Sequence, residues 1–246
     1  MTGKTFLITG GTSGIGRTLA ARLSTQGHQV IITGRDQARV NEASRALGCS
    51  GFVADSADLA QLQALASALG NDQIRLDGLV LNAGVFYPGT LADGSGEDLA
   101  TAFDQTLAIN TKGPLLTLKL LQPLLNNPSS VVFVSSIAVS KGFMGAAVYS
   151  ASKAAFEAAA RVANLEYAGL GIRINHVRPG VTATEIQGKA GMTDEQQQGL
   201  FASLAATPLG RVMSADDQVG AIEFLLSEQS LAMRSAVLEV DGGYQL

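Results

Sequence analysis

The chain alternates short apolar, β-branched runs with longer segments of helical periodicity over nearly its whole length. After the first run, Ile15, Leu19 and Leu23 recur every fourth residue and form one apolar helix face, which Gly27 ends. This alternation is typical of βαβ units, in which helices connect and cover parallel strands. It predicts one α/β domain over residues 1–246, with a doubly wound, seven-stranded parallel sheet and helices on both faces. The expected strands are 5–9, 29–33, 51–54, 78–81, 130–134, 172–177 and 236–240.

Composition excludes several other classes of protein. No apolar run approaches the ~20 residues that a membrane-spanning helix needs, and Phe6-Leu7-Ile8 is too short for the apolar region of a secretory signal. With a formal net charge of −4, the chain lacks the basic excess that attracts nucleic acid or anionic lipid. Cys49 is the only cysteine, which excludes an intramolecular disulfide. We therefore expect a cytoplasmic protein with neither nucleic acid nor membrane as a partner.

Two segments interrupt the alternation, and both follow strand ends. Residues 86–97 are rich in Gly and Pro, and residues 185–212 are polar. Ligands bind beyond the carboxyl ends of parallel strands, so these segments are candidates for substrate walls, with 185–212 as a lid. The alternative interpretation is a mobile surface excursion.

A glycine-rich turn, Thr9-Gly10-Gly11-Thr12-Ser13-Gly14-Ile15-Gly16, lies between the first expected strand and the first helix. Glycines there let the backbone approach a pyrophosphate, and the free N–H groups at the start of the helix attract that anion. By itself the turn is weak evidence, because an ordinary strand-to-helix turn also uses glycine. Its position after the first strand favours a dinucleotide site.

The turn and a series of later motifs resemble those of the short-chain dehydrogenase/reductase family. These are Thr9-Gly-x-x-x-Gly14-Ile15-Gly16, Asn82-Ala83-Gly84, Asn110, Ser136, Tyr149-x-x-x-Lys153, Pro179-Gly180-x-x-x-Thr184 and Val240-Asp241-Gly242-Gly243. The resemblance spans the chain and implies a Rossmann fold, with a cofactor half over about 1–130 and a catalytic half over about 131–246. It also implies a homotetramer, or a homodimer.

By motif position, the resemblance assigns most of the cofactor contacts. The residues that it implies are Gly10, Thr12, Ser13, Gly14, Ile15, Gly16, Asp55, Ser56, Asn82, Ala83, Gly84, Tyr149, Lys153, Pro179, Gly180, Val181 and Thr184. Asp55 has a second interpretation, as the N-cap of the helix that follows it.

The end of the second strand bears on which nicotinamide cofactor is used. In dinucleotide folds an acid there binds the ribose hydroxyls of NAD, but this chain has Gly34-Arg35. A guanidinium can pair with the 2′-phosphate of NADP through two charge-assisted hydrogen bonds. We expect NADP(H) rather than NAD(H). Asp36 is the alternative, as the ribose ligand of an NAD enzyme, and Arg17 is a second candidate for the phosphate or an exposed helix residue.

Tyr149 and Lys153 lie four residues apart on an expected helix and therefore share one face. A tyrosine has a pKa of about 10, and we expect the lysine charge to stabilise its phenolate, although such a pair is otherwise an ordinary surface feature. Ser136 ends a strand, where its hydroxyl can orient a carbonyl oxygen, whereas Ser135 should point to the opposite face. By resemblance, Asn110 holds a water that relays protons from Lys153.

Together these residues predict an NADP(H)-dependent oxidoreductase that reduces a ketone or aldehyde carbonyl to an alcohol, with no metal. Two alternatives remain: a 3-oxoacyl-[acyl-carrier-protein] reductase of the same family, and a non-catalytic NADP(H)-binding regulator. The stretches 120–130 and 168–172 contain no Lys or Arg, which disfavours an acidic carrier protein. Candidate pocket walls are Phe86, Tyr87, Ile137, Ala138, Phe143 and Met144. We expect His28 and His176, in strand-like runs, to be ordinary hydrogen-bonded histidines.

Overall fold

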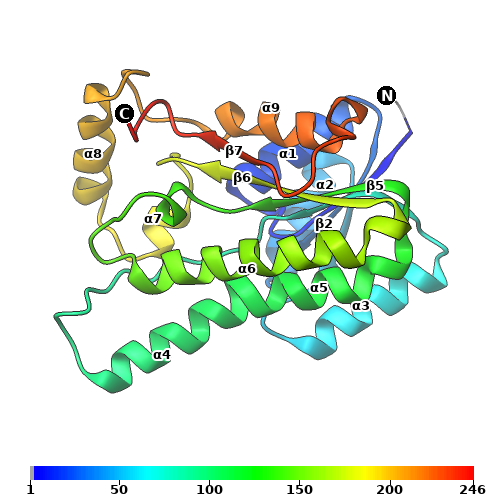
Figure 1. Ribbon diagram of the computed structural model, residues 1–246, viewed down its shortest axis with the longest axis horizontal. Helices are drawn as coiled ribbons and strands as arrows, with labels where there is room; N and C mark the ends of the chain where they lie inside the picture. The colour runs from blue at the N-terminus through cyan, green and yellow to red at the C-terminus, as the bar shows by residue number, and fades with distance from the viewer. Residues whose placement is uncertain (1–2) are drawn as a thin grey trace.

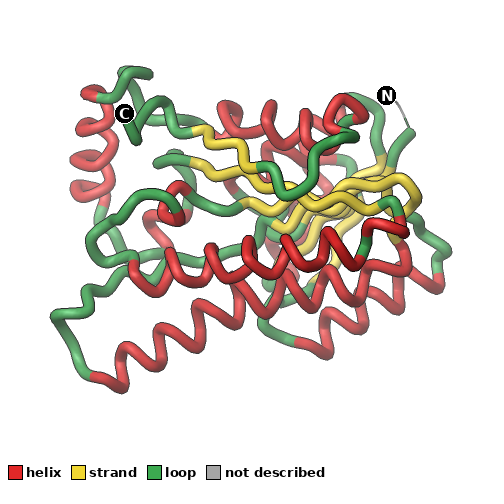
Figure 2. Tube along the Cα trace, viewed as in Figure 1, coloured by secondary structure: helices red, strands yellow, loops and turns green. Residues whose placement is uncertain are grey.

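A parallel β-sheet forms the centre of the molecule (Figures 1 and 2). The computed structural model describes residues 3–246, and within them the sheet has seven strands in the order β3-β2-β1-β4-β5-β6-β7. Every adjacent pair is parallel, so the predicted doubly wound fold is confirmed. The strands are β1 Thr5–Ile8, β2 Gln29–Gly34, β3 Ser50–Val53, β4 Leu76–Leu81, β5 Leu125–Val134, β6 Ile172–Pro179 and β7 Val237–Val240.

Helices cover both faces of the sheet, as Figure 1 shows. On one face lie α3 (Leu59–Asn71), α5 (Gly113–Leu121) and α6 (Ala147–Glu166), and on the other lie α1 (Gly14–Thr25), α2 (Gln37–Leu47) and α9 (Ala215–Leu226). Helix α4 (Gly96–Leu107) packs on α6. Each face has its own core: Phe133 and Phe156, with ring centroids 4.1 Å apart, lie on the first, and Ile8, Leu19 and Ile222 on the second.

Strands β4 and β5 begin earlier than the apolar pattern predicts. Asp77 lies inside β4, where its carboxylate accepts hydrogen bonds from the Thr5 backbone (2.8 Å) and the Asn126 side chain (2.9 Å). The first part of β5 is polar, and Arg75 donates to the carbonyl of Leu125 (3.0 Å). Polar residues can occupy these strand ends because side chains from neighbouring elements satisfy their hydrogen bonds.

The segment 185–212 is largely helical. It contains α7 (Ile186–Lys189), α8 (Asp194–Ser203) and a 3₁₀ turn, Leu204–Ala206. A reciprocal pair of hydrogen bonds between Thr193 and Gln196 caps α8. The segment 86–95, by contrast, has no helix or strand before α4 begins.

One wide π-helical turn, Ala108–Lys112, connects α4 to α5. Such turns are rare in proteins and occur frequently at functional sites. This one places the fully buried Asn110 against the loop that follows β4.

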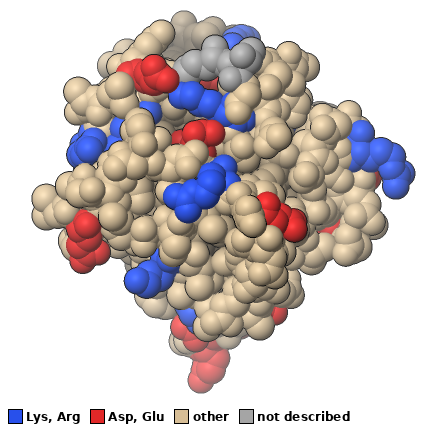
Figure 3. Space-filling model, turned by 90° about the vertical axis from the view of Figure 1, so that its right-hand side faces the viewer, with Lys and Arg blue, Asp and Glu red and all other residues tan. Residues whose placement is uncertain are grey.

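The strand order reverses between β1 and β4, where crossovers leave in opposite directions and open a crevice at the carboxyl ends of the strands. Figure 3 shows the face at the opposite, amino-terminal ends, where the acidic and basic side chains that are visible lie scattered among uncharged ones. Over residues 3–246, no helix has the length and apolar character to cross a membrane.

Candidate active site

The glycine turn between β1 and α1 is packed too tightly for side chains at three positions. Gly10 (φ +66°) would place a Cβ 2.9 Å from the Ala83 Cα, and Gly16 would place one 2.5 Å from the Asn82 Nδ2. Gly14 (φ +54°) faces Thr184, with 3.3 Å to the Thr184 Cβ. This close-packed backbone ends at the start of α1, as a phosphate-binding turn requires.

Hydrogen bonds join this turn to the segment after β4. The Thr9 hydroxyl accepts from the backbone N–H groups of Asn82 (3.0 Å) and Ala83 (3.1 Å). In return, Asn82 Nδ2 donates to the carbonyls of Thr9 (3.0 Å) and Gly10 (3.1 Å). This role of Thr9 is not among the site residues predicted from the sequence. Its position directly before Gly10, the first glycine of the turn, is the sequence feature that could indicate it.

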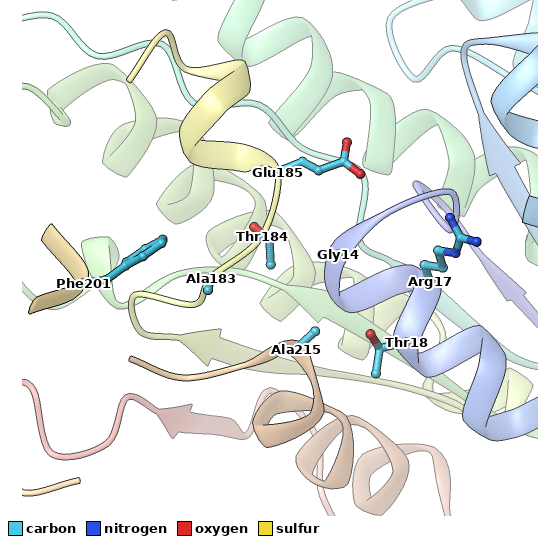
Figure 4. A pocket seen from close by; sticks show the side chains of 8 residues that line it. All are labelled: Gly14, Arg17, Thr18, Ala183, Thr184, Glu185, Phe201 and Ala215. Atoms are coloured by element: carbon cyan, nitrogen blue, oxygen red, sulfur yellow. The ribbon is translucent and has the colours of Figure 1, made fainter. Parts of the chain in front are cut away.

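The segment after β6 forms the facing wall of a pocket, shown in Figure 4. Thr184 points toward Gly14, and Phe201 from α8 points in from the other side. The lining residues are Gly14, Arg17, Thr18, Ala183, Thr184, Glu185, Phe201 and Ala215. Pro179, Gly180 and Val181 lead into this wall from β6.

Ion pairs connect the segment 185–212 to helix α2, and a hydrogen bond connects it to the glycine turn. Glu185 pairs with Arg39 of α2 (2.9 Å) and with Lys189 of α7 (2.9 Å), and Lys189 also donates to the Ser13 hydroxyl (3.1 Å). All these groups are substantially exposed, so each pair contributes at most about 1 kcal/mol. The sequence does not predict the pair of Arg39 and Glu185, since their contact depends on how the segment 185–212 packs against α2.

The residues at the end of β2 have different local roles. Arg35 is exposed and follows the strand directly. The carboxylate of Asp36 accepts from the Arg39 backbone N–H (2.8 Å) and caps α2. Arg17 pairs with Glu42 (2.9 Å).

The capping interpretation of Asp55 is wrong. Asp58 caps α3, accepting from Ala60 and Gln61, whereas Asp55 accepts from the Ala57 backbone N–H one turn earlier (2.9 Å). The cap falls on Asp58 because the chain makes a further turn before the helix starts. Ser56 and the segment 82–84 follow β3 and β4 at the same edge of the sheet.

Ser136, Tyr149 and Lys153 come together at the end of β5. The Ser136 side chain lies close enough to the Tyr149 phenol to lower its pKa, and the Phe86 ring packs edge-on against the Tyr149 ring, with 5.1 Å between centroids. The Lys153 Nζ lies 5.8 Å from the Tyr149 ring centroid and donates to the Val134 carbonyl (2.9 Å). The face predicted from the four-residue spacing is thus the face that meets Ser136.

Asn110 joins this group from the π-helical turn. Its amide accepts from the Val85 N–H and donates to the Val85 carbonyl (both 2.9 Å) and to the Ser152 hydroxyl (3.1 Å). A Cβ on Gly84 would lie 3.1 Å from the Lys153 Nζ and 3.2 Å from the Asn110 Oδ1, so a side chain there would crowd both groups.

The expected acidity of Tyr149 is not what the structure gives. Desolvation raises the pKa of the phenol, and the Ser136 side chain opposes that rise only in part. The same burial lowers the pKa of Lys153 to about 8, against a smaller opposing effect of Glu157. The physical reason is that water is excluded from both groups, which favours their neutral forms.

The two adjacent serines point to opposite faces, as expected from strand geometry. Ser135 is buried and donates to the Glu157 carboxylate (2.5 Å), away from Tyr149. The two histidines differ from the expectation in their hydrogen bonds. His176 lies in β6 as expected, whereas His28 lies just before β2. Among residues 3–246, the Nδ1 of His28 and both ring nitrogens of His176 have no hydrogen-bond partner. Apolar packing explains this: the Phe6 and Phe133 rings lie edge-on against His28 and His176.

The residues predicted to form the pocket walls differ in their exposure to solvent. Ile137 and Ala138 are buried, Phe143 stacks on Tyr244, and Met144 is 95% exposed. In the part of the chain that the structure describes, no three His, Cys, Asp or Glu side chains cluster as metal ligands would.

Comparison with known proteins identifies the family. A family model described as "Enoyl-(Acyl carrier protein) reductase" matches residues 10–245. The chain is 35% identical to "Oxidoreductase asL5" of Sarocladium schorii, over 99% of this chain and 96% of that protein. It is 31% identical to L-xylulose reductase of Bos taurus, over 99% and 97%. A solved "short chain dehydrogenase/reductase family protein" superposes with a TM-score of 0.83 at 31% identity, over 100% and 99% of the two chains.

The fold, the site and these relatives define a nicotinamide-dependent oxidoreductase of the alcohol/carbonyl type. The chain belongs to the short-chain dehydrogenase/reductase family.

Proposed function

We propose that this protein is an NADP(H)-dependent carbonyl reductase in which Tyr149, Ser136 and Lys153 carry the chemistry. The observation that supports it most is that the buried Lys153 ammonium lies 5.8 Å from the centroid of the Tyr149 ring and donates to the Val134 carbonyl, at the end of the strand that Ser136 follows. Bound reduced nicotinamide supplies a hydride to the carbonyl carbon. A regulator that had lost its reaction would have no need of this arrangement.

Tyr149 donates the proton that the carbonyl oxygen takes up. Burial raises the pKa of the phenol and keeps it protonated at neutral pH, so Tyr149 carries the proton to be donated. The Ser136 hydroxyl binds the same oxygen and orients it toward the phenol. Lys153 brings a positive charge close to Tyr149 and stabilises the phenolate that proton transfer leaves behind.

Asn110 contributes through its position in the π-helical turn. Its side-chain amide is fully engaged with Val85 and Ser152, so it fixes the loop after β4 against α6. We assign to its backbone carbonyl the holding of a water through which Lys153 exchanges protons with solvent.

The residues of the crevice fit a dinucleotide. The glycine turn exposes backbone at the N-terminus of α1, where Thr12 and Ser13 add hydroxyls, and Asn82, Ala83 and Gly84 line its other side. We assign Arg35, exposed at the end of β2, to the 2′-phosphate of NADP(H); the engagement of the Asp36 carboxylate as a helix cap supports this assignment. In Arg35→Asp, kcat/KM should move from NADPH toward NADH. An unchanged ratio would contradict the assignment.

The central test of the reaction is Tyr149→Phe. We expect it to abolish NADPH oxidation with a panel of ketones and aldehydes while leaving NADPH binding, measured by fluorescence, intact. Full activity in this variant would overturn the proposed mechanism. Tight NADPH binding by the unmodified protein with no turnover on any substrate would instead favour the non-catalytic regulator.

A second candidate is a 3-oxoacyl-[acyl-carrier-protein] reductase. It is favoured by the description of the matching family model and by a relative named "Monensin polyketide synthase putative ketoacyl reductase", 31% identical over 98% of this chain. The lack of basic residues in 120–130 and 168–172 weighs against it. The ratio of kcat/KM for a free ketone to that for an acyl-carrier thioester distinguishes the two.

We further propose a homotetramer or homodimer in the cytoplasm. Helices α4 and α6 expose Leu99, Phe103, Val162 and Leu165, and an apolar groove runs between the two helices. A second copy packing on these helices would bury this surface. Light scattering that gave a monomer would contradict the assembly.

A further inference from the structure

A buried carboxylate that the proposed reaction does not use lies one turn beyond Lys153. Glu157 is on the same face of α6, and only 5% of its side chain is exposed. It accepts from the Ser135 hydroxyl (2.5 Å) and from two nitrogens of Arg178, Nε (3.0 Å) and Nη2 (2.7 Å). Carboxylates are buried this deeply almost only when paired, and the bidentate geometry is the strongest kind of pair.

The Lys153 ammonium and the Glu157 carboxylate both bond to the end of β5. The Lys153 Nζ donates to the neutral carbonyl of Val134, and Glu157 accepts from the next residue, Ser135. Lys153 is 3% exposed, and the charge on Glu157 raises the pKa of the lysine against the larger effect of burial.

The other charged or titratable groups near Glu157 lie on α6 and β6. Arg178 of β6 pairs with it directly. Burial lowers the pKa of His176, also of β6, to about 4, so the imidazole is neutral at neutral pH, and the charge on Arg161 of α6 also lowers that pKa. Burial raises the pKa of Glu157, but the hydrogen bonds from Arg178 and Ser135 outweigh it, lower the pKa below its ordinary value and keep the carboxylate ionised at neutral pH.

We propose that Glu157 is a positioning residue: its carboxylate, one helical turn from Lys153, supplies the negative charge that favours an ammonium beside Tyr149, and through Ser135 it ties the strand end that carries Ser136 to α6. This role rests on the proposed function, because it acts on the residues assigned to the reaction there.

A second set of contacts keeps this carboxylate in place. Arg178 also pairs with Glu239 of β7 (2.8 Å), so its guanidinium bridges two acids and cannot turn away from Glu157 without losing both. Glu239 in turn accepts from the Ser140 hydroxyl (2.8 Å) and the Gln245 amide (2.7 Å). The network therefore extends from α6 across β6 and β7 to the turn that begins at Ser136 and to the C-terminal segment.

The test replaces the charge while keeping the shape. In Glu157→Gln we expect the pKa of Lys153 to fall by about 1 unit, because an opposite charge on the adjacent turn is lost. The titration is followed by NMR of lysine labelled with ¹³C at Cε, and the Lys153 signal is assigned by its absence in Lys153→Met. The alkaline limb of kcat/KM should move to lower pH by the same amount.

Two further variants separate charge from structure. Glu157→Asp retains the charge and should keep the Lys153 titration within a few tenths of a unit of the unmodified protein, while kcat falls several-fold because the shorter side chain loses contact with Ser135 or Arg178. Glu223→Gln, which removes an acid paired with Arg22 (3.0 Å) on the other face of the sheet, should change neither quantity.

An unchanged Lys153 titration in Glu157→Gln would overturn the proposal. If that variant does not fold, unmodified kcat in Glu157→Asp would overturn it equally. Since the NMR titration needs no turnover, it decides this proposal even if Tyr149→Phe remains active and the proposed reaction fails.

Discussion

Gly16→Ala and Gly220→Ala are the same substitution in two helices, and the structure predicts opposite effects. A Cβ on Gly16, in the first turn of α1, would lie 2.5 Å from the Asn82 Nδ2 and 2.7 Å from the Gly10 carbonyl oxygen. A Cβ on Gly220, inside α9, meets no atom within 4 Å. The first must displace its neighbours by about 1 Å to reach ordinary contact distance, and the second displaces nothing.

The size of each effect follows from the contacts. Displacing the Asn82 amide breaks its bonds to Thr9 and Gly10, each contributing about 0.5–1.5 kcal/mol. Alanine recovers up to about 1 kcal/mol of helix propensity, which leaves Gly16→Ala roughly 1–2 kcal/mol less stable. Gly220→Ala receives only the propensity gain, roughly 0.5–1 kcal/mol of stabilisation. In a domain of this size each kcal/mol shifts Tm by about 2–4 °C.

Thermal unfolding and NADPH binding measured together test this reasoning. We expect Gly16→Ala to lower Tm by roughly 2–8 °C and to weaken NADPH binding at least about tenfold, a loss of 1.4 kcal/mol or more, because the displaced backbone lines the crevice. Gly220→Ala should raise Tm and leave the binding unchanged. Unaltered Tm and NADPH affinity in Gly16→Ala would refute the packing argument.

Three other outcomes follow from the structure. Phe156→Ala removes the ring that packs on Phe133 and should cost about 3–5 kcal/mol in urea unfolding, and a loss below 1 kcal/mol would mean that the core collapses into the space. Carbonyl reduction should decline as pH rises through about 8, because burial lowers the pKa of Lys153 to that value and the ammonium is lost above it. A kcat/KM profile that stays flat to pH 10 would contradict this. Thr193→Ala removes half of the cap of α8, so amide exchange should quicken in residues 194–203 with little change in the global Tm; uniform protection would show that the cap is dispensable.

Much of this fold could be predicted because apolar periodicity distinguishes strands from helices. The prediction failed where polar residues belong to strands, as at Asp77 in β4 and Asn126 in β5, because their partners Thr5 and Arg75 are remote in sequence or unremarkable in pattern. The π-helical turn at Asn110 has no sequence signature of its own.

In the candidate site, too, the features that depend on local sequence could be predicted, and those that depend on packing between distant elements could not. The Tyr149–Lys153 spacing and the serine at a strand end are local features, and the structure brings them together. The pKa of Tyr149 was mispredicted because desolvation depends on packing from several elements, which spacing does not describe. The four-residue distance between Lys153 and Glu157 indicates that the two side chains share one helix face. The partner of Glu157, Arg178, is not predictable in this way, because the two residues become neighbours only when β6 packs against α6.

The π-helical turn Ala108–Lys112 contains one residue more than a regular α-helical turn, and this residue sets the rotation of α4 relative to α5 about the helix axis. The two helices face different surroundings, since α4 exposes Phe103 and α5 packs in the core. Each residue of an α-helix turns the chain by about 100°. Deleting one residue from this turn would restore regular geometry but would rotate α4, with Phe103, relative to α5, whose Pro114 and Leu118 are buried in the core. Chain length at this point is therefore constrained independently of residue identity, and chimeras between relatives should preserve the number of residues from α4 to α5.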